Sequence, residues 1–293
     1  MRVIFQWLVE FRGGARILLV ERTAMHDTGV RRFVETLNTP ALQYSDELAQ
    51  DRAGQDRLDS LFTIALAHRG NSRALMMLNS DCFVGPDFPA ILEATIPKHG
   101  DFLITGVRFV FPEHDQLEFN PLNQSIAEYA AEHILSPGPK RYNPIRHDML
   151  DFFAFREKYR FVPPFRIGKS VWDNWLFAEA HDRLKWTTIS GGIEEPVLYL
   201  VHPGESCFLF FVLFILRLTH SAEHQRPHQF VGAEKLHPGQ HNRHLAYLYG
   251  GLGGGGVASR SNQMLRWCDD GGVCIGNTTI LSGEDLRESR KRK

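Results

Sequence analysis

The stretch Ala74-Leu75-Met76-Met77-Leu78-Asn79-Ser80-Asp81-Cys82 decides the fold, because an apolar run here ends in a polar tip that carries a carboxylate. A continuous apolar run of this length, bounded by polar residues, predicts a buried strand of a mainly parallel sheet. In open α/β sheets, ligands bind at the carboxyl ends of the strands. Asp81 is therefore predicted to lie at a ligand site. The alternative role for an aspartate in this position is to cap the next helix.

Strand and helix patterns alternate along the rest of the first 202 residues. Strands are predicted at 15–20, 101–110, 152–155 and 197–201, and the last of them ends at His202. Helices are predicted at 4–11, 57–67, 124–135 and 171–180. This alternation predicts an α/β fold with a mixed, mainly parallel central sheet. An α/β nucleotide-binding domain normally opens with a strand, so the helix-first start predicts that the first strand is missing.

The composition excludes several classes of protein. The chain has 293 residues, 43% of them hydrophobic, which is enough for a large core. Its formal net charge is −1, so no strong field would draw it to nucleic acid or to an acidic membrane surface. The start of the chain lacks the pattern of a signal peptide, and the apolar run 207–216 is about half as long as a membrane span. No transmembrane segment is expected, and the cytoplasm is the default location, with the Golgi lumen as the alternative if the N-terminus is truncated.

The four cysteines, Cys82, Cys207, Cys268 and Cys274, are scattered along the chain. None forms a Cys-x-x-Cys pair, which argues against a structural zinc site. A disulfide framework is not expected in a chain of this length. The cysteines are therefore predicted to be free thiols in a reducing compartment.

Residues 203–240 are predicted to be an irregular insertion, followed at 241–293 by a glycine-rich segment and a basic tail. Within the insertion, 204–229 contains a long apolar run without period or capping. One hypothesis is a retained intron, because the codons for residues 204–206 and 228–229 are compatible with intron boundaries. The other is a buried core strand or helix. The sequence leaves both hypotheses open.

Several motifs together resemble a known enzyme family. They are Asn79-Ser80-Asp81, Gly106-Val107-Arg108, Asp-Phe-Phe-Ala-Phe at 151–155, Pro-Pro-Phe-Arg-Ile-Gly-Lys-Ser-Val-Trp-Asp-Asn-Trp at 163–175, and Val201-His202. The set is similar to a poorly characterised group of nucleotide-sugar-dependent glycosyltransferases of the A-type fold. The resemblance covers residues 5–202 and resumes at 241–245, and the Trp-Asp-Asn-Trp block is its most specific part. It implies a single A-type glycosyltransferase domain over 1–202.

The resemblance also implies a metal site and a donor site. Asp81 would hold Mn²⁺ or Mg²⁺ together with His202, and the metal would neutralise the diphosphate of a nucleotide sugar. Asn79 stands where the family usually has an aspartate, which leaves one carboxylate in the triplet. Asn79 and Ser80 would instead hydrogen-bond ribose or phosphate, and Arg108 would contact phosphate. Alternatively, His202 is a structural histidine and Arg108 pairs with a surface acid.

The resemblance assigns the acceptor side to the helix that follows Pro163-Pro164. Asp173 would take the proton of the acceptor hydroxyl as the general base, and Trp172 and Trp175 would line the acceptor site. In the alternative interpretation both tryptophans belong to the core, and Asp173 is an acidic residue at a helix N-terminus.

These motifs predict a metal-dependent glycosyltransferase that moves a hexosyl group from a nucleotide sugar to a glycan, protein or small-molecule acceptor. The alternative function is a degenerate transferase that binds nucleotide or glycan without turnover, and the Asn79 substitution favours it. A structural protein or a defective gene product is a further alternative, which the 204–229 segment favours.

Overall fold

The structure is a computed structural model that describes residues 16–22, 30–79, 83–85, 87–110, 152–156, 159, 161–169, 171–192, 197–202, 210–213, 238–251 and 261–291. The strands in these ranges are β1 (Ile17–Arg22), β2 (Leu42–Leu48), β3 (Leu75–Asn79), β4 (Phe83–Val84), β5 (Phe102–Val110), β6 (Phe152–Phe155), β7 (Thr187–Ser190), β8 (Tyr199–His202), β9 (Phe210–Leu213), β10 (Gln263–Trp267), β11 (Val273–Ile275) and β12 (Thr278–Leu281). The helices are α2 (Val30–Leu37), α3 (Leu58–His68), α4 (Phe88–Thr95), α6 (Trp172–Ala178), α7 (Pro238–Leu248) and α8 (Gly283–Lys291), and a π-helix, η2, covers Glu179–Arg183.

The strand and helix predictions are confirmed wherever the structure describes the chain. β1, β3, β5, β6 and β8 lie at the predicted strands within two residues at each end, and α3 lies at the helix predicted for 57–67. The helix predicted for 171–180 is split, because α6 ends at Ala178 and η2 continues it. The helices predicted for 4–11 and 124–135 lie outside the described residues.

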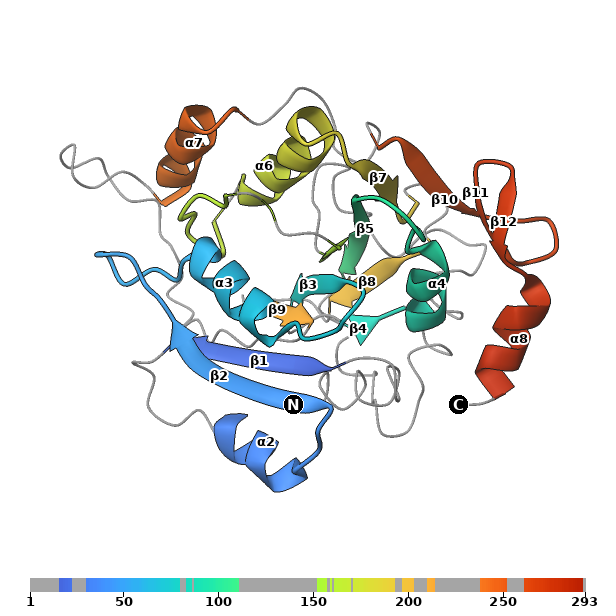
Figure 1. Ribbon diagram of the computed structural model, residues 1–293, viewed down its shortest axis with the longest axis horizontal. Coiled ribbons are helices and arrows are strands. Elements are labelled where there is room, and N and C mark those ends of the chain that lie inside the picture. The colour runs from blue at the N-terminus through green and yellow to red at the C-terminus, as the bar shows by residue number, and fades with distance from the viewer. Residues whose placement is uncertain are drawn as a thin grey trace.

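The strands form one mixed sheet of 12 strands, whose main path runs β12-β11-β10-β7-β5-β6-β3-β9-β1-β2 (Figure 1). Of the pairings among the described strands, β1–β2, β5–β7, β5–β8 and β7–β10 are parallel and the other seven are antiparallel. The mixed sheet was predicted correctly, but its mainly parallel character was not. An apolar run indicates a strand that is covered on both faces, and it carries no information on strand direction.

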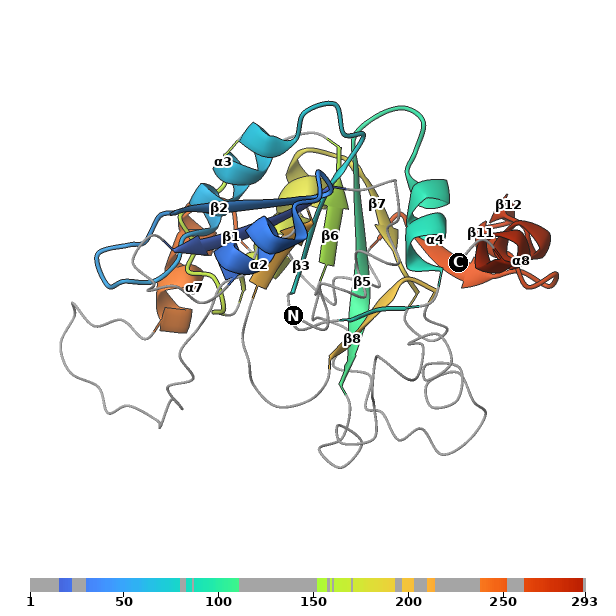
Figure 2. The same ribbon diagram turned by 90° about the horizontal axis from the view of Figure 1, so that it is seen from below.

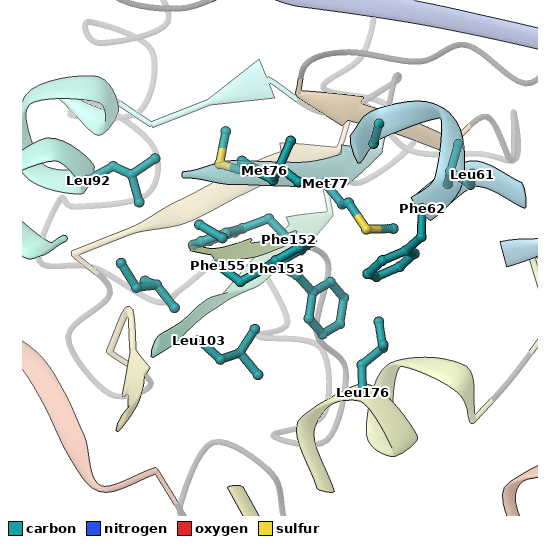
Figure 3. Packing of buried hydrophobic residues seen from close by; sticks show 14 of the residues in the cluster. Leu61, Phe62, Met76, Met77, Leu92, Leu103, Phe152, Phe153, Phe155 and Leu176 are labelled. Atoms are coloured by element: carbon teal, nitrogen blue, oxygen red, sulfur yellow. The ribbon is translucent and has the colours of Figure 1, made fainter. Parts of the chain in front are cut away.

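Helices cover both faces of the sheet, and β6 shows how. Alternate residues of a strand point to opposite faces. Phe155 stacks on Phe62 of α3, and Phe153 contacts Trp172 of α6, with ring centroids 5.5 Å apart in both pairs. Phe152 contacts Phe88 of α4 at 5.1 Å on the other face. Figure 3 shows the resulting packing, with Phe62 and Leu176 on one side of the sheet and Leu92 on the other.

Strand β9 belongs to the segment for which a retained intron and a core strand were both considered. It lies between β3 and β1 (Figure 1) and runs antiparallel to both. Val212 is the register partner of Met77 on one side and of Leu18 on the other. Four residues of the segment therefore form a strand inside the sheet, which favours the core-strand hypothesis for them. The rest of 204–229 lies outside the described residues.

Along one of its two edges, strand β5 pairs first with β7 and then with β8. Its first half pairs with β7 up to Thr105, and its second half pairs with β8 from Val107 (Figure 2). Gly106 lies at the change of partner. A β-carbon on Gly106 would stand 2.4 Å from the Leu198 carbonyl oxygen and 2.2 Å from the Phe152 ring. Glycine is required there because Leu198, just before β8, and Phe152 of β6 approach the backbone of β5 too closely for any side chain.

The C-terminal residues continue the same sheet. Strand β10 pairs in parallel with β7 through Gln263 and Met264, and β11 and β12 follow it as an antiparallel meander. The segment predicted to be only glycine-rich and basic therefore contains α7, three strands and α8 among its described residues. Cys268 and Cys274 form a disulfide across the turn between β10 and β11, with Cα atoms 5.7 Å apart. The prediction of free thiols is thus wrong for these two cysteines, because a tight hairpin brings them together.

The disulfide gives the first testable prediction. The Cα separation of 5.7 Å lies within the usual range for a disulfide, so we expect protein produced under oxidising conditions to carry this bond. Both cysteines lie between Arg266 and Arg287 with no other basic residue between them, so trypsin releases them in one peptide. Without reductant, that peptide should be lighter by two hydrogen atoms than after reduction and should resist alkylation. Alkylation of both cysteines in the native, unreduced protein would contradict the bond.

Candidate functional site

Two of the sequence motifs lie on adjacent strands, Gly106-Val107-Arg108 on β5 and Val201-His202 on β8, and β4 pairs with β8 on its other side. β4 runs antiparallel to β8, with Phe83 opposite Val201, so the chain enters β4 one register position from His202. β5 runs parallel to β8 on its other side, with Val110 opposite His202 and Arg108 opposite Leu200. The backbones of Arg108 and His202 therefore lie on adjacent strands, close to their carboxyl ends. Both are described by their backbone alone.

The Asn79-Ser80-Asp81 triplet lies between β3 and β4. Asn79 is the last residue of β3 and is paired with Phe210 of β9. Ser80 and Asp81 lie outside the described residues. Asp81 precedes Phe83 by two residues in the sequence, and two residues of chain span at most about 7 Å. The pairing of Phe83 with Val201 places the start of β4 beside the end of β8.

The first turn of α6 lies over the same part of the sheet. Trp172 contacts Phe153, whose register partners are Met77 on β3 and Thr105 on β5. Those partners precede Asn79 by two residues and Arg108 by three. Asp173 follows Trp172 directly and is half-buried. The half-buried carboxylate therefore belongs to a helix that packs on β6, which lies between β3 and β5 in the sheet.

The backbone that leads into α6 is strained. Val171, the residue before the helix, has φ 81° and ψ −13° and is buried, and its carbonyl accepts the Trp175 amide at 3.0 Å. A β-branched residue in this left-handed region is an outlier. Such conformations persist only where the surroundings impose them, and they concentrate at functional sites. The turn before Asp173 therefore holds a conformation that costs local stability, as turns at functional sites often do.

Trp172 and Trp175 are part of the core. They are 8% and 1% exposed, respectively. The Trp175 ring lies against Phe165, with centroids 5.4 Å apart, and below the guanidinium of Arg183 at 5.3 Å. A ring that is 1% exposed offers almost no surface to a ligand, so its burial favours the interpretation of Trp175 as a core residue over its assignment to the acceptor site.

Asn242 joins the Pro163–Lys169 loop to the C-terminal part of the chain. Its fully buried amide accepts from the Arg166 backbone N–H at 2.8 Å and donates to the Arg166 carbonyl at 2.9 Å. The Arg166 guanidinium donates to Asp51 at 2.6 Å. Burial acts to raise the pKa of Asp51, but hydrogen bonds from the Gln55 amide and from Arg166 outweigh it and lower that pKa. The motif block at 163–175 and the segment at 241–245 thus belong to one packed unit.

Burial lowers the pKa of two further groups in this unit. Lys169 is partly buried, and the neighbouring positive charge of Arg166 adds to the effect of burial on its pKa. Burial likewise lowers the pKa of His241, with Arg166 contributing in the same direction. His241 is therefore predominantly neutral at neutral pH.

Two exposed aromatic residues near α6 were not predicted as site residues. Phe161 and Tyr249 are 51% and 42% exposed, and their ring centroids lie 5.0 Å apart. Phe161 precedes the Pro163-Pro164 pair, and Tyr249 follows the last residue of α7. The sequence holds no periodic signal for either, because their proximity depends on how α7 packs against α6.

Neither metal ligation nor membrane insertion has direct support in the described part of the chain. No group of three or more His, Cys, Asp or Glu side chains gathers among those residues, which exclude Asp81. None of the described helices has the length and hydropathy of a membrane span. Comparison of the chain with family models, curated proteins and solved structures finds no match.

Proposed function

We propose that the protein is a metal-dependent glycosyltransferase of the A-type fold, which moves a hexosyl group from a nucleotide sugar to an acceptor. The observation that supports this best is the register of β4, β8 and β5. Arg108 and His202 lie on adjacent strands, and β4, which follows the Asn79-Ser80-Asp81 triplet in the sequence, pairs with β8. The motifs that supply these residues are up to 123 residues apart in the sequence. Strand ends of this kind are where open α/β sheets bind ligands.

Asp81 and His202 would hold the divalent cation. A carboxylate and an imidazole are suitable ligands for Mn²⁺, and two protein ligands leave positions open for phosphate oxygens. The backbone register is compatible with this pair, because Phe83, two residues after Asp81, is the partner of Val201. When bound, the cation would neutralise the negative charge that develops on the departing diphosphate.

The donor would be held by side chains on the same strands. The Arg108 guanidinium can form two parallel hydrogen bonds to a phosphate group. Asn79 and Ser80 carry amide and hydroxyl groups that suit ribose or phosphate oxygens. These contacts would fix the diphosphate so that the bond to the sugar points to the acceptor side.

Asp173 would act as the general base on the acceptor. Its carboxylate would take the proton of the acceptor hydroxyl while that oxygen attacks the anomeric carbon, and the nucleoside diphosphate would leave. Its half-burial and the strained turn at Val171 support this role, because a base must be held in a fixed direction.

The proposal predicts that Asp81→Ala loses metal-dependent binding of nucleotide while the protein keeps its fold. The test starts with a screen of sugar nucleotides for Mn²⁺-dependent thermal stabilisation, because a ligand that binds only the native state raises the melting temperature. Titration of wild type and Asp81→Ala with UDP and Mn²⁺ then compares affinities. Asp101→Ala, at an exposed acid just before β5, is the matched control. Equal affinities in wild type and Asp81→Ala would remove Asp81 from the site.

A second function is a transferase-like protein that binds nucleotide or glycan without turnover. The specific observation in its favour is Asn79, which leaves the triplet with a single carboxylate. Metal-dependent release of nucleotide from a sugar nucleotide separates the two. An enzyme gives multiple turnovers, whereas a binding protein gives stabilisation without product.

A further inference from the structure

Asn242 of α7 holds the backbone that leads to the strained residue Val171. Its fully buried side chain accepts from the Arg166 N–H at 2.8 Å and donates to the carbonyls of Arg166 at 2.9 Å and of Lys169 at 3.4 Å. Lys169 precedes Val171 by two residues. Arg57 forms a β-bridge with Arg166, so the start of this loop has a further support. The contacts of Asn242 extend that support towards Val171.

A second contact between α7 and this segment lies on the other side of Val171. The backbone N–H of Trp175 donates to the Val171 carbonyl at 3.0 Å, and its indole N–H donates to the Tyr249 carbonyl at 3.0 Å. Tyr249 follows Asn242 by seven residues, which is about two helical turns, so both contacts come from the same side of α7. Helix α7, which lies beside α6 in Figure 1, therefore holds the chain both before and after Val171.

The strain at Val171 explains why a support on each side matters. Val171 has φ 81°, in a region that β-branched residues avoid. Such a conformation persists only where the surrounding structure imposes it. Without the Asn242 amide, the backbone before Val171 would be less restrained and could turn to an unstrained conformation. Asp173, two residues further on, would then change direction.

We propose that Asn242 is a positioning residue, which holds the Val171 turn in its strained conformation and thereby directs the Asp173 carboxylate. The direction of this carboxylate matters to the reaction only if Asp173 is the base, so that part rests on the proposed function. The restraint of the turn by Asn242 does not depend on the proposed function and is tested separately.

The first test is amide hydrogen exchange at Trp175, measured by NMR relative to the Met77 amide of β3, so that a general loss of stability is subtracted. Asn242→Ala should raise this relative exchange rate about tenfold or more, because the turn that accepts the Trp175 N–H opens more often. Asn262→Ala is the matched control. The Asn262 side chain also bonds the backbone of a distant segment, since it accepts from the Thr188 N–H at 3.0 Å. The control should leave the relative rate within about twofold of wild type.

A second variant shows whether Asn242 acts through the strain at Val171. Glycine adopts positive φ without strain, so Val171→Gly should keep the turn in place without the Asn242 amide. In that background Asn242→Ala should raise the relative exchange rate of Trp175 by less than about threefold. An equal effect in both backgrounds, or no effect in either, would overturn the inference. If Asn242→Ala alone does not fold, folding of the double variant supports the inference, and failure of both variants to fold contradicts it.

The effect on the reaction is measured with water in place of the acceptor, as hydrolysis of UDP-glucose, UDP-galactose and UDP-N-acetylglucosamine in the presence of Mn²⁺. Asn242→Ala should lower kcat about 10²-fold with the affinity for UDP unchanged, because a misdirected base affects the chemical step alone. Asn262→Ala should keep kcat within about twofold of wild type. An unchanged kcat, or an equal loss of UDP affinity, would overturn the positioning of Asp173. If the wild type hydrolyses none of the three, that result counts against the proposed transfer function, and the exchange measurements still decide whether Asn242 holds the turn.

Discussion

Deletion of residues 204–229 is expected to abolish cooperative unfolding, because it removes β9 from between β3 and β1. The strand has four registered pairs with β3 and one with β1, and Leu18 and Met77 beside it are buried. Each buried backbone group that loses its partner costs about 1–3 kcal/mol, against a total stability of about 5–15 kcal/mol. In a urea titration followed by circular dichroism, the deletion variant should show no sigmoidal unfolding transition.

Point variants localise the effect to the strand. Val212→Pro removes one ladder donor from a central strand and should cost about 3 kcal/mol or more, whereas Val212→Ile keeps the shape and should cost about 1 kcal/mol or less. If the deletion variant instead unfolds at the wild-type urea concentration, β9 is dispensable and the retained-intron hypothesis gains support.

Replacement of Asp173 by asparagine is expected to reduce transfer by about 10²–10⁴-fold while donor binding stays unchanged. An amide cannot accept the proton of the acceptor hydroxyl. The change is isosteric, so the Val171 turn and the packing of Trp172 should persist and the loss of stability should be small. Nucleotide release is measured with and without acceptor, alongside donor affinity and the melting temperature, using the sugar nucleotide that stabilises the wild type.

Asp182→Asn is the matched control for this experiment, because Asp182 is also a half-buried acid and lies on the adjoining π-helix. It should transfer within a few-fold of wild type. Transfer by Asp173→Asn within a few-fold of wild type would exclude Asp173 as the base. If Asp173→Asn lost transfer and its melting temperature also fell sharply, Asp173 would have a structural role.

Several elements of the fold were predictable from the sequence, whereas others, such as β2, β7 and β10, and the pairing of the strands were not. Apolar runs and helical spacing predict burial and periodicity, and they located β3, β5 and α3 correctly. The position of β9 depends on its pairing with distant strands, such as that of Val212 with Leu18, which no local pattern predicts. The Cys268–Cys274 bond was missed for a related reason, since it depends on the turn between β10 and β11.

The candidate site was predictable only in outline. The motifs named residues from different strands, and the register of β4, β8 and β5 is compatible with their convergence. The sequence also located an aromatic region around Trp172 and Trp175, but it could not tell which rings are buried. Composition alone does not decide this, because a tryptophan serves equally well in a core and in a binding site.

The central place of β9 has a consequence for synthesis of the chain on the ribosome. Val212 follows its β3 partner Met77 by 135 residues. At about 5–20 residues per second, translation takes about 7–27 s to cover that distance. During this interval the nascent chain already contains β1 and β3 but not the strand that separates them. Their facing edges are then open to pairing with other strands, so a chaperone that shields strand edges should raise the yield of folded protein.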